Sequence, residues 1–191
     1  YEWRSSAWRG RPWHETVFYE MHVGTFTDEG TFDSAIERLD HLKATGITAI
    51  ELLPVAEFGG RRGWGYDGVL LYCPHGVYGG HRGLKRLVDA AHERGLMVFL
   101  DVVYNHFGPD GNYIPSYLPD FFQSEIHTPW GPAIAYDEPA VRDFMIENAL
   151  YWLEEYRIDG LRLDAIDSIH DTTDTPLVEE LAKRVRAAFP D

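Results

Sequence analysis

Met97-Val98-Phe99-Leu100-Asp101-Val102-Val103 is the stretch that decides the fold. It is an apolar run of strand length with a single carboxylate inside it, which is typical of a buried strand. The stretch before it ends at Gly95 and repeats apolar residues at helical spacing, namely Leu84, Leu87, Val88 and Ala91. The sequence therefore predicts a helix that leads into a buried strand.

This strand-and-helix unit occurs four times along the chain. We expect strands over residues 17–23, 47–55, 97–103 and 160–166. The helices between and after them carry apolar faces over residues 32–42, 84–91, 141–152 and 177–189. Thr31 is placed to cap the first helix, and Glu138-Pro139 opens the third. Strands that alternate with helices predict a parallel sheet.

Two architectures fit this α/β pattern. A doubly wound sheet would be complete at 191 residues, whereas a (β/α)8 TIM barrel needs about 250 residues and would be half present. The segments 56–82 and 104–137 follow the carboxyl ends of strands and are much longer than ordinary connections. Long loops at that end build active sites in both architectures, so the pattern alone leaves the choice open.

Composition excludes several classes of protein. The 17 basic and 31 acidic residues give a formal net charge of −14, which repels a phosphate backbone, so we expect no nucleic-acid partner. No apolar run is long enough to cross a membrane, and Tyr1-Glu2-Trp3-Arg4 does not begin a signal peptide. The single cysteine, Cys73, fits a reducing compartment. We expect a cytoplasmic protein without a membrane partner.

Residues 1–16 follow neither the helical nor the strand period. They combine three tryptophans with Pro12 and several arginines. We expect this segment to be a linker that arrives from an upstream domain and packs against residues 17–191, the barrel segment.

The fourth strand places charges on one face. In Gly160-Leu161-Arg162-Leu163-Asp164, alternation sends both leucines to one side and Arg162 with Asp164 to the other. Asp101 on the neighbouring strand could lie about 4.8 Å away across the sheet and pair with Arg162. The guanidinium would keep Asp164 ionised, as a covalent nucleophile must be. The alternative is that Asp164 caps the next turn and the other two form a structural pair.

Two stretches then resemble the signature segments of the α-amylase clan of glycoside hydrolases, in the order found in that clan. They are Asp101-Val102-Val103-Tyr104-Asn105-His106 and Gly160-Leu161-Arg162-Leu163-Asp164-Ala165. Others resemble the trehalose-releasing branch of the clan, from about Trp8 to the end of the chain: residues 19–27, 29–32, 64–68, 111–113, 128–131 and 148–153.

The resemblance implies the N-terminal half, about four βα units, of a (β/α)8 TIM barrel. It also implies roles for individual residues. Asp164 would be the catalytic nucleophile, Arg162 its partner, and Asp101 the carboxylate that holds the arginine. His106 would hydrogen-bond the sugar at the cleaved bond, and Tyr66 would stack on the apolar face of that sugar. Alternatively, Tyr66 fills the core beneath its loop.

Other polar and aromatic residues have two interpretations. In calcium-dependent relatives the residue that matches Asn105 ligates the ion, but the six to eight oxygen donors of a calcium site cannot be assembled here. We expect Asn105 to orient its loop, Asp67 to stabilise a turn, and no metal or cofactor. Trp130 and Tyr113 would line sugar subsites or pack their loop down, and His22 would be a core histidine or a site wall.

The resemblance predicts hydrolysis of the α-1,4 linkage next to the trehalose end of a maltooligosyltrehalose, with retention and release of trehalose. The clan takes its general acid from the fifth strand and a third carboxylate from the seventh, both beyond Asp191. We therefore expect the chain to be part of a longer polypeptide and inactive alone.

Two other functions remain open. One is a 1,4-α-glucan branching transferase, against which the sequence from Gly111 to Gly131 argues. The other is a non-catalytic glucan-binding module, against which the presence of both Arg162 and Asp164 argues.

Overall fold

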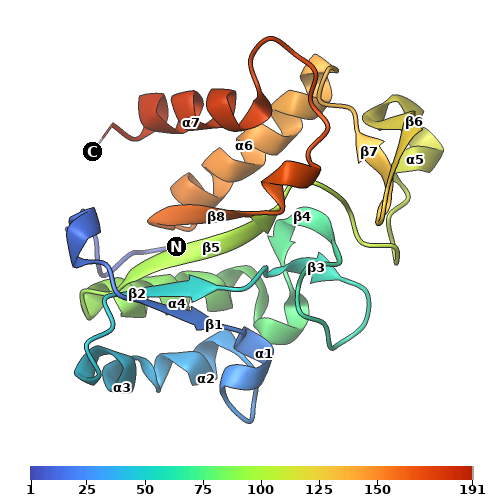
Figure 1. Cartoon of the computed structure of the whole chain (residues 1–191). Helices are drawn as coiled ribbons and strands as arrows, with labels where there is room; N and C mark the ends of the chain where they lie inside the picture. Colours follow the sequence, from blue (N-terminus) through green and yellow to red (C-terminus); the bar gives the residue numbers. More distant parts are fainter. Residues whose placement is uncertain (191) are drawn as a thin grey trace.

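The computed structural model describes residues 1–190; Asp191, the last residue of the expected barrel segment, lies outside them. A parallel sheet forms the centre (Figure 1), with the order β1-β2-β5-β8. Its strands are β1 (Phe18–Met21), β2 (Ala49–Leu52), β5 (Met97–Val103) and β8 (Gly160–Asp164). Each strand lies beside the one that precedes it in this series, without the reversal of order that defines a doubly wound sheet. The sheet is therefore the first half of a (β/α)8 barrel wall, as the resemblance predicted.

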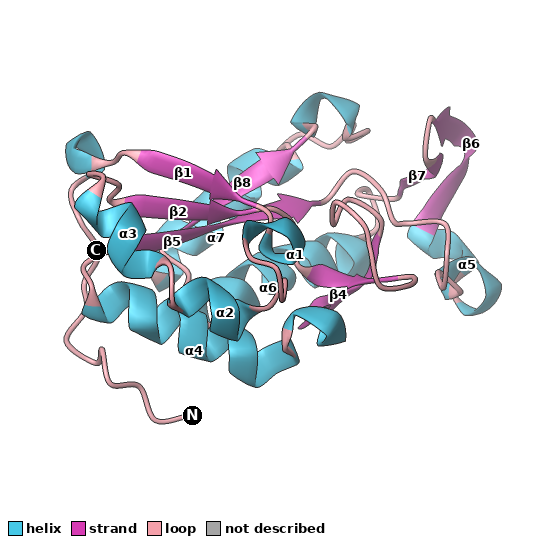
Figure 2. Cartoon of the chain, turned by 90° about the horizontal axis from the view of Figure 1, so that it is seen from below, coloured by secondary structure: helices cyan, strands magenta, loops and turns pink. Residues whose placement is uncertain are grey.

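Helices cover the outer face of this sheet, and Figure 2 shows α2 and α4 beneath the strands. The helices are α1 (Val23–Phe26), α2 (Phe32–Ile36), α3 (Leu39–Ala44), α4 (Gly80–Glu93), α5 (Ile114–Tyr117), α6 (Pro139–Glu155) and α7 (Leu177–Ala188). Leu84, Leu87 and Val88 on α4 are fully buried, as their spacing predicted. Within residues 1–190, no helix has the length and apolar content that crossing a bilayer requires.

The helix expected over residues 32–42 is two helices in the structure. Thr31 caps the first, because its side chain accepts a hydrogen bond from the backbone N–H of Ser34. At the junction, Glu37 and Arg38 donate to carbonyls three residues back, which tightens the turn and ends α2. The apolar face nevertheless continues across the junction, since Phe32 and Leu39 are both fully buried.

The two segments expected to be long loops contain structure of their own. Each holds an antiparallel pair at the end toward which the arrows of β1 and β2 point (Figure 1). The pairs are β3 (Ala56–Phe58) with β4 (Gly68–Pro74), and β6 (Phe122–Thr128) with β7 (Gly131–Ile134). Register irregularities interrupt both pairs, which explains why no clean alternation marks them in the sequence.

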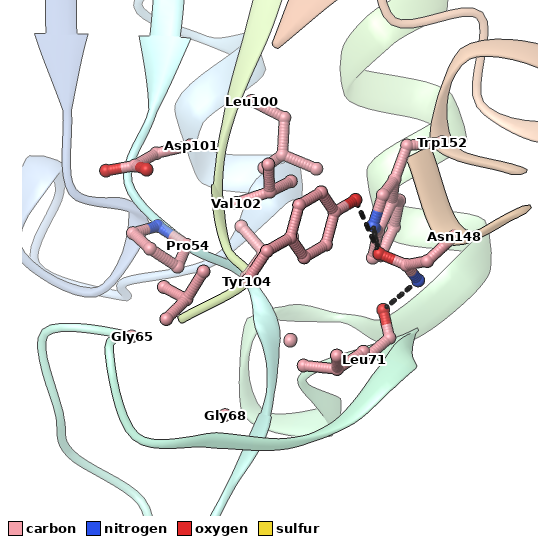
Figure 3. A pocket seen from close by; sticks show the side chains of 13 residues that line it. Pro54, Gly65, Gly68, Leu71, Leu100, Asp101, Val102, Tyr104, Asn148 and Trp152 are labelled. Atoms are coloured by element: carbon pink, nitrogen blue, oxygen red, sulfur yellow. Dashed lines mark hydrogen bonds between the residues drawn. The ribbon is translucent and has the colours of Figure 1, made fainter. Parts of the chain in front are cut away.

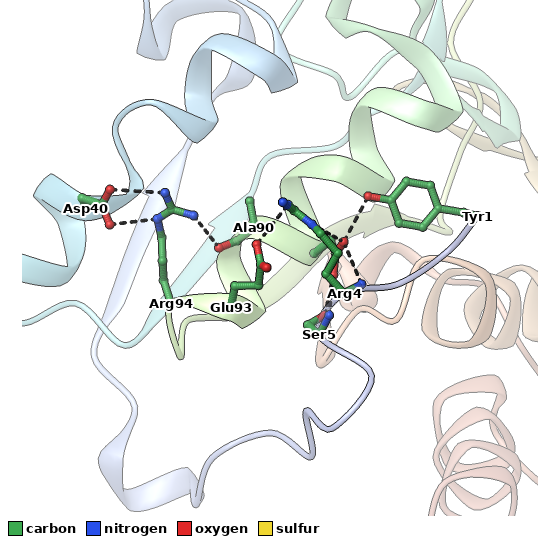
Figure 4. A network of polar contacts seen from close by, with 8 residues as sticks. Tyr1, Arg4, Ser5, Asp40, Ala90, Glu93 and Arg94 are labelled. Carbon is green, nitrogen blue, oxygen red and sulfur yellow. Dashed lines mark hydrogen bonds and ion pairs between the residues drawn. The ribbon is translucent and has the colours of Figure 1, made fainter.

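The N-terminal segment is anchored to the opposite end of the sheet. Ser5 donates to the Asp89 carboxylate on α4 through its backbone N–H and its hydroxyl, at 2.9 and 2.7 Å. Tyr1 and Arg4 reach the same carboxylate (Figure 4). Trp8 stacks on His92, with 4.8 Å between ring centroids. Residues 1–8 thus pack against the helical layer through specific polar contacts.

Candidate active site

One arginine joins two carboxylates at the carboxyl end of the sheet. Arg162 Nη1 lies 3.0 and 2.9 Å from the two carboxylate oxygens of Asp101, and 2.5 Å from Oδ1 of Asp164. The ion pair predicted between Asp101 and Arg162 is therefore present, and Asp164 shares the same guanidinium. Within residues 1–190 the Asp164 side chain hydrogen-bonds only to Arg162 and to no backbone N–H of the next turn, so the alternative role of Asp164 as a cap does not describe the structure.

Strand register brings these side chains together. Asp101 on β5 is the direct neighbour of Arg162 on β8 in the parallel ladder. On both strands the alternate residues face outward, and Leu161 and Leu163 pack against the hydrophobic core. Figure 3 shows Asp101 on the side of β5 opposite to Leu100 and Val102. The polar triad accordingly lies on the inner face of the barrel wall.

Burial and hydrogen bonding act in opposite directions on this triad. Burial raises the pKa of Asp101 to about 6, and hydrogen bonds from Arg162 and Tyr66 oppose that rise. Desolvation alone would lower the pKa of Arg162, but hydrogen bonds to both carboxylates outweigh it and raise that pKa. The guanidinium therefore stays charged beside Asp164, whose side chain is 19% exposed and accessible from the barrel interior.

Tyr66 reaches the triad from the loop between β3 and β4. Its hydroxyl donates to Oδ2 of Asp101 at 2.8 Å, and its side chain is half-buried. Gly65 permits this approach, because it has φ +99° and a Cβ there would lie 2.0 Å from the carbonyl oxygen of Pro54. The ring does not fill the hydrophobic core, and its contact with Asp101 is one that the sequence did not indicate.

His106 lies close to this loop. Its Nε2 is 2.9 Å from the carbonyl oxygen of Tyr66, so that nitrogen carries the proton. Burial lowers the pKa of His106, which favours the neutral ring. Trp130 stacks on the ring at 4.7 Å with 15° between the planes, and 46% of Trp130 remains exposed. Trp130 therefore packs against His106, which agrees with one of its two expected roles, and part of its ring stays exposed.

The structure separates the remaining candidate residues. Asn105 is buried, and neither of its amide atoms has a hydrogen-bond partner within residues 1–190, so the expected loop-orienting bond is not found. Asp67 is exposed, and Tyr113 is 71% exposed and takes part in none of the triad's hydrogen bonds. His22 is half-buried and contacts Gly63 in the Tyr66 loop, as a wall of the site would. Over the described chain, no group of three His, Cys, Asp or Glu side chains is arranged to hold a metal ion.

Sequence reasoning missed two acidic residues on the inner face. Glu20 on β1 is the register partner of Glu51 on β2, and Glu51 in turn pairs with Phe99 on β5. Burial raises the pKa of Glu51, the charge of Glu20 adds to that rise, and Arg162 opposes it. The alternation in Ala49-Ile50-Glu51-Leu52 could have revealed this, since Ile50 and Leu52 face the helices.

A buried polar network beneath β5 supports the loops that carry the site. Tyr104 Oη and Trp152 Nε1 both donate to Oδ1 of Asn148, at 2.8 and 3.0 Å, and Asn148 Nδ2 donates to the carbonyl of Leu71 on β4. Figure 3 shows this network around a cavity of about 20 Å³. It ties β4 to α6, so the strand that follows the Tyr66 loop is attached to the helical layer.

The arrangement contains the groups that a carboxylate nucleophile requires around it. A partly accessible carboxylate is held by a permanently charged guanidinium, which is itself fixed by a buried carboxylate. A tyrosine ring and a neutral imidazole border the same end of the sheet. Such a carboxylate can attack a carbon that develops positive charge, and aromatic rings can pack against apolar faces of a ligand.

Comparison with known proteins bears on this geometry. Residues 15–120 match the family described as alpha amylase, catalytic domain. Malto-oligosyltrehalose trehalohydrolases from Arthrobacter ramosus and Deinococcus radiodurans are 53% and 49% identical to the chain; each alignment covers 97% of this chain, and 32% and 31% of the relatives. A Salmonella typhimurium crystal structure described as a "putative alpha amylase" has a TM-score of 0.97 and 56% identity, over 98% of this chain and 32% of that one. The chain spans about a third of the length of these relatives.

Proposed function

The chain belongs to the alpha-amylase catalytic-domain family, and from that premise we propose that it supplies the nucleophile half of a retaining α-glucoside hydrolase. The proposed reaction is cleavage of the α-1,4 linkage next to the trehalose end of a maltooligosyltrehalose, with release of trehalose. The observation that carries the proposal is the triad, in which Arg162 bridges the buried Asp101 and the accessible Asp164.

In the proposed first step, an oxygen of Asp164 bonds to the anomeric carbon while the bond from that carbon to the leaving oxygen breaks. The leaving oxygen takes a proton from a second carboxyl, which retaining enzymes hold about 5–5.5 Å from the nucleophile. Asp101 does not suit that role, since it accepts hydrogen bonds from both Arg162 and Tyr66. We assign the proton donor to the strand that follows β8 in the whole barrel.

In the second step, water attacks the same carbon and gives its proton to the second carboxylate while the bond to Asp164 breaks, so the configuration is restored. Arg162 stabilises the negative charge that returns to Asp164. Neutral His106 donates from Nε2, and a small shift away from the Tyr66 carbonyl would let it donate to a sugar hydroxyl instead.

The choice of substrate is supported by similarity to trehalohydrolases along nearly the whole chain. Those relatives are named for an enzyme that acts on malto-oligosyltrehalose. The substrate, the trehalose product and the absence of a cofactor are all parts of this proposal. A cytoplasmic location, supported by the single free Cys73, and a linker role for residues 1–16 belong to it as well.

The test uses the full-length polypeptide that contains this chain. It is incubated separately with maltooligosyltrehalose and with amylose, and the products are analysed for free trehalose and for new branch points. Trehalose released only from the first substrate supports the proposal. New α-1,6 branches in amylose without trehalose would identify a branching transferase, and binding without any product would identify a glucan-binding module.

A further inference from the structure

A groove lies at the carboxyl end of β1 and β2, against the loop that carries Tyr66. It has a volume of about 650 Å³, within the range of about 300–1,000 Å³ that is common for small-molecule sites. Its walls come from the end of β1, the segment after β2 and the loop that carries Tyr66. The residues that matter here are His22, Arg61, Arg62, Trp64 and Tyr78.

The floor of the groove is a fixed structure. His22 Nε2 is 2.9 Å from the carbonyl oxygen of Gly63, and its Nδ1 is 3.1 Å from the hydroxyl of Thr25. Because a carbonyl only accepts, the ring donates from Nε2 to Gly63. The buried Tyr78 ring meets His22 edge-on, with 6.1 Å between centroids. The loop is thereby tied, at the residue before Trp64, to the residue that follows β1.

The rim of the groove carries exposed side chains that take no part in packing or in hydrogen bonds within residues 1–190. Trp64 is 77% exposed, the largest exposed fraction among the exposed large hydrophobic residues of the described chain. Arg61 and Arg62 are exposed, and neither forms a hydrogen bond or ion pair through its guanidinium within residues 1–190. One aromatic face and two sets of N–H donors are thus available to a ligand.

The sheet order indicates which part of a substrate would reach this groove. In a retaining hydrolase the acid lies on the side of the leaving group, while the nucleophile bonds to the retained sugar. One edge of β8 is already paired with β5, so a following strand that carries the acid can add only at the other edge. The leaving trehalose then lies beyond β8, and the retained glucan extends toward β5, β2 and β1.

We propose that the groove between β1 and the Arg61–Trp64 loop binds glucosyl units of the retained chain and sets the preference for chain length. This inference rests on the proposed function. Trp64 supplies a ring for the C–H face of a pyranose, and Arg61 and Arg62 donate to its hydroxyls. Gly65 alone separates Trp64 from Tyr66, whose hydroxyl donates to Asp101, so one short loop contributes to both the groove and the triad.

The ligand class follows from the chemistry of the groove. A neutral polyhydroxylated ring needs an apolar platform and hydrogen-bond donors, and both are present. An anionic ligand would meet the two arginines but would also face a chain with a formal net charge of −14. An apolar ligand would leave the arginines without a role.

The experiment compares Trp64→Ala with the unchanged enzyme, both as full-length proteins. Substrates are trehalose extended by one, two, three or four glucosyl units, and kcat and KM are measured for each. We expect Trp64→Ala to raise KM about tenfold for the longer substrates, with kcat unchanged, and to leave the one-unit substrate unaffected. Replacing both arginines by alanine should raise the same KM values by a smaller factor.

Two controls separate binding from folding. Trp13→Ala removes a tryptophan that is 72% exposed at the other end of the sheet, and it should change no KM value. Trp64→Phe keeps an aromatic ring and should lose only part of the effect. A second measurement does not depend on turnover: calorimetric binding of maltohexaose to Asp164→Asn should weaken about tenfold when Trp64→Ala is added.

Several outcomes would overturn the inference. KM values that do not change, that change by the same factor at every chain length, or that respond equally to Trp13→Ala would each exclude a length-sensing groove. If the unchanged enzyme releases no trehalose but acts on other glucans, the proposed function fails. In that case a length-dependent loss in Trp64→Ala would still support the groove as a glucan site.

Discussion

The two ends of one parallel sheet both hold buried carboxylates, yet they use them differently. At the amino end, Asp159 accepts hydrogen bonds from Trp8 Nε1, His92 Nε2 and the backbone N–H of Val98, at 2.6, 2.8 and 2.7 Å. At the carboxyl end, Asp101 and Asp164 share a single guanidinium. Asp159 thus accepts hydrogen bonds from three different donor groups, whereas Asp164 accepts from Arg162 alone.

The electrostatic consequences have opposite signs. Burial alone would raise the pKa of Asp89, near the amino end, but hydrogen bonds from Ser5, Arg4 and Tyr1 outweigh it and lower the pKa to about 2. Burial instead dominates at Asp101 and raises its pKa to about 6. The hydrogen bonds that a buried carboxylate accepts, weighed against its burial, therefore set the direction in which its pKa moves.

Replacing the nucleophile should give the largest effect. Asp164→Asn keeps the shape of the side chain but removes its charge, so we expect turnover to fall by at least about 10³-fold with little change in the thermal midpoint. Trehalose release by the full-length protein and its melting curve provide the measurement. Asp167→Asn, an exposed aspartate three residues later, is the matched control and should remain active. Equal turnover in the two variants would remove Asp164 from the mechanism.

Removing the Asp159 carboxylate at the amino end should lower the free energy of unfolding without changing kcat. Asp159→Ala leaves the donors of Trp8 and Val98 without a partner, and we expect a loss on the order of 3 kcal/mol in the free energy of unfolding. Below the melting transition, kcat should match that of the unchanged protein. Denaturant unfolding and steady-state kinetics test the two halves of this prediction. A lowered kcat at full folding would mean that the two ends of the sheet are coupled.

The sequence allowed the inner-face geometry to be predicted because strands have a period of two. Once Asp101 and Arg162 were assigned to neighbouring strands, alternation sufficed to bring them together. The choice between a doubly wound sheet and a barrel could not be made from periodicity, because both repeat the same strand-and-helix unit. Resemblance made that choice, and the strand order agrees with it.

Contacts between segments far apart in the chain could not be predicted in this way. The bonds from Tyr66 to Asp101 and from Trp8 to Asp159 span 35 and 151 residues. Each depends on where an irregular segment lies in space, and no local pattern encodes that position. The exposure of Trp64 could not be predicted for a related reason, because it depends on which segments pack around the folded loop.

A smaller effect is expected from Tyr66, which affects the pKa of Asp101 at the carboxyl end of the sheet. The hydrogen bond from Tyr66 lowers the pKa of Asp101, so Tyr66→Phe should raise that pKa above its value of about 6. A protonated Asp101 no longer holds Arg162 by charge, so activity is lost as the pH falls through this pKa. We expect the acid limb of kcat/KM to lie near pH 6 and to move to higher pH in the variant.

The pH profile of kcat/KM is the measurement for this prediction. We expect kcat/KM near neutral pH to fall by no more than about tenfold in Tyr66→Phe. Tyr113→Phe changes a tyrosine that is 71% exposed and should leave the profile as it was. An acid limb that stays in place, or that moves to lower pH, would show that Asp101 does not govern it.

The smallest effect is expected from Arg4, an exposed residue that contacts Asp89 near the amino end of the sheet. Arg4 is 63% exposed and lies 3.4 Å from Asp89 and 2.9 Å from Glu93, so water and salt screen both contacts. We expect Arg4→Ala to cost less than about 1 kcal/mol, and to cost less still in 0.5 M salt. Ser5→Ala should cost about 1–3 kcal/mol, because it withdraws a hydroxyl donor from the buried Asp89. Denaturant unfolding of both variants tests this ranking. If Arg4→Ala lowers the free energy of unfolding as much as Ser5→Ala does, ion pairing, and not the hydrogen bonds from Ser5, holds the N-terminal segment in place.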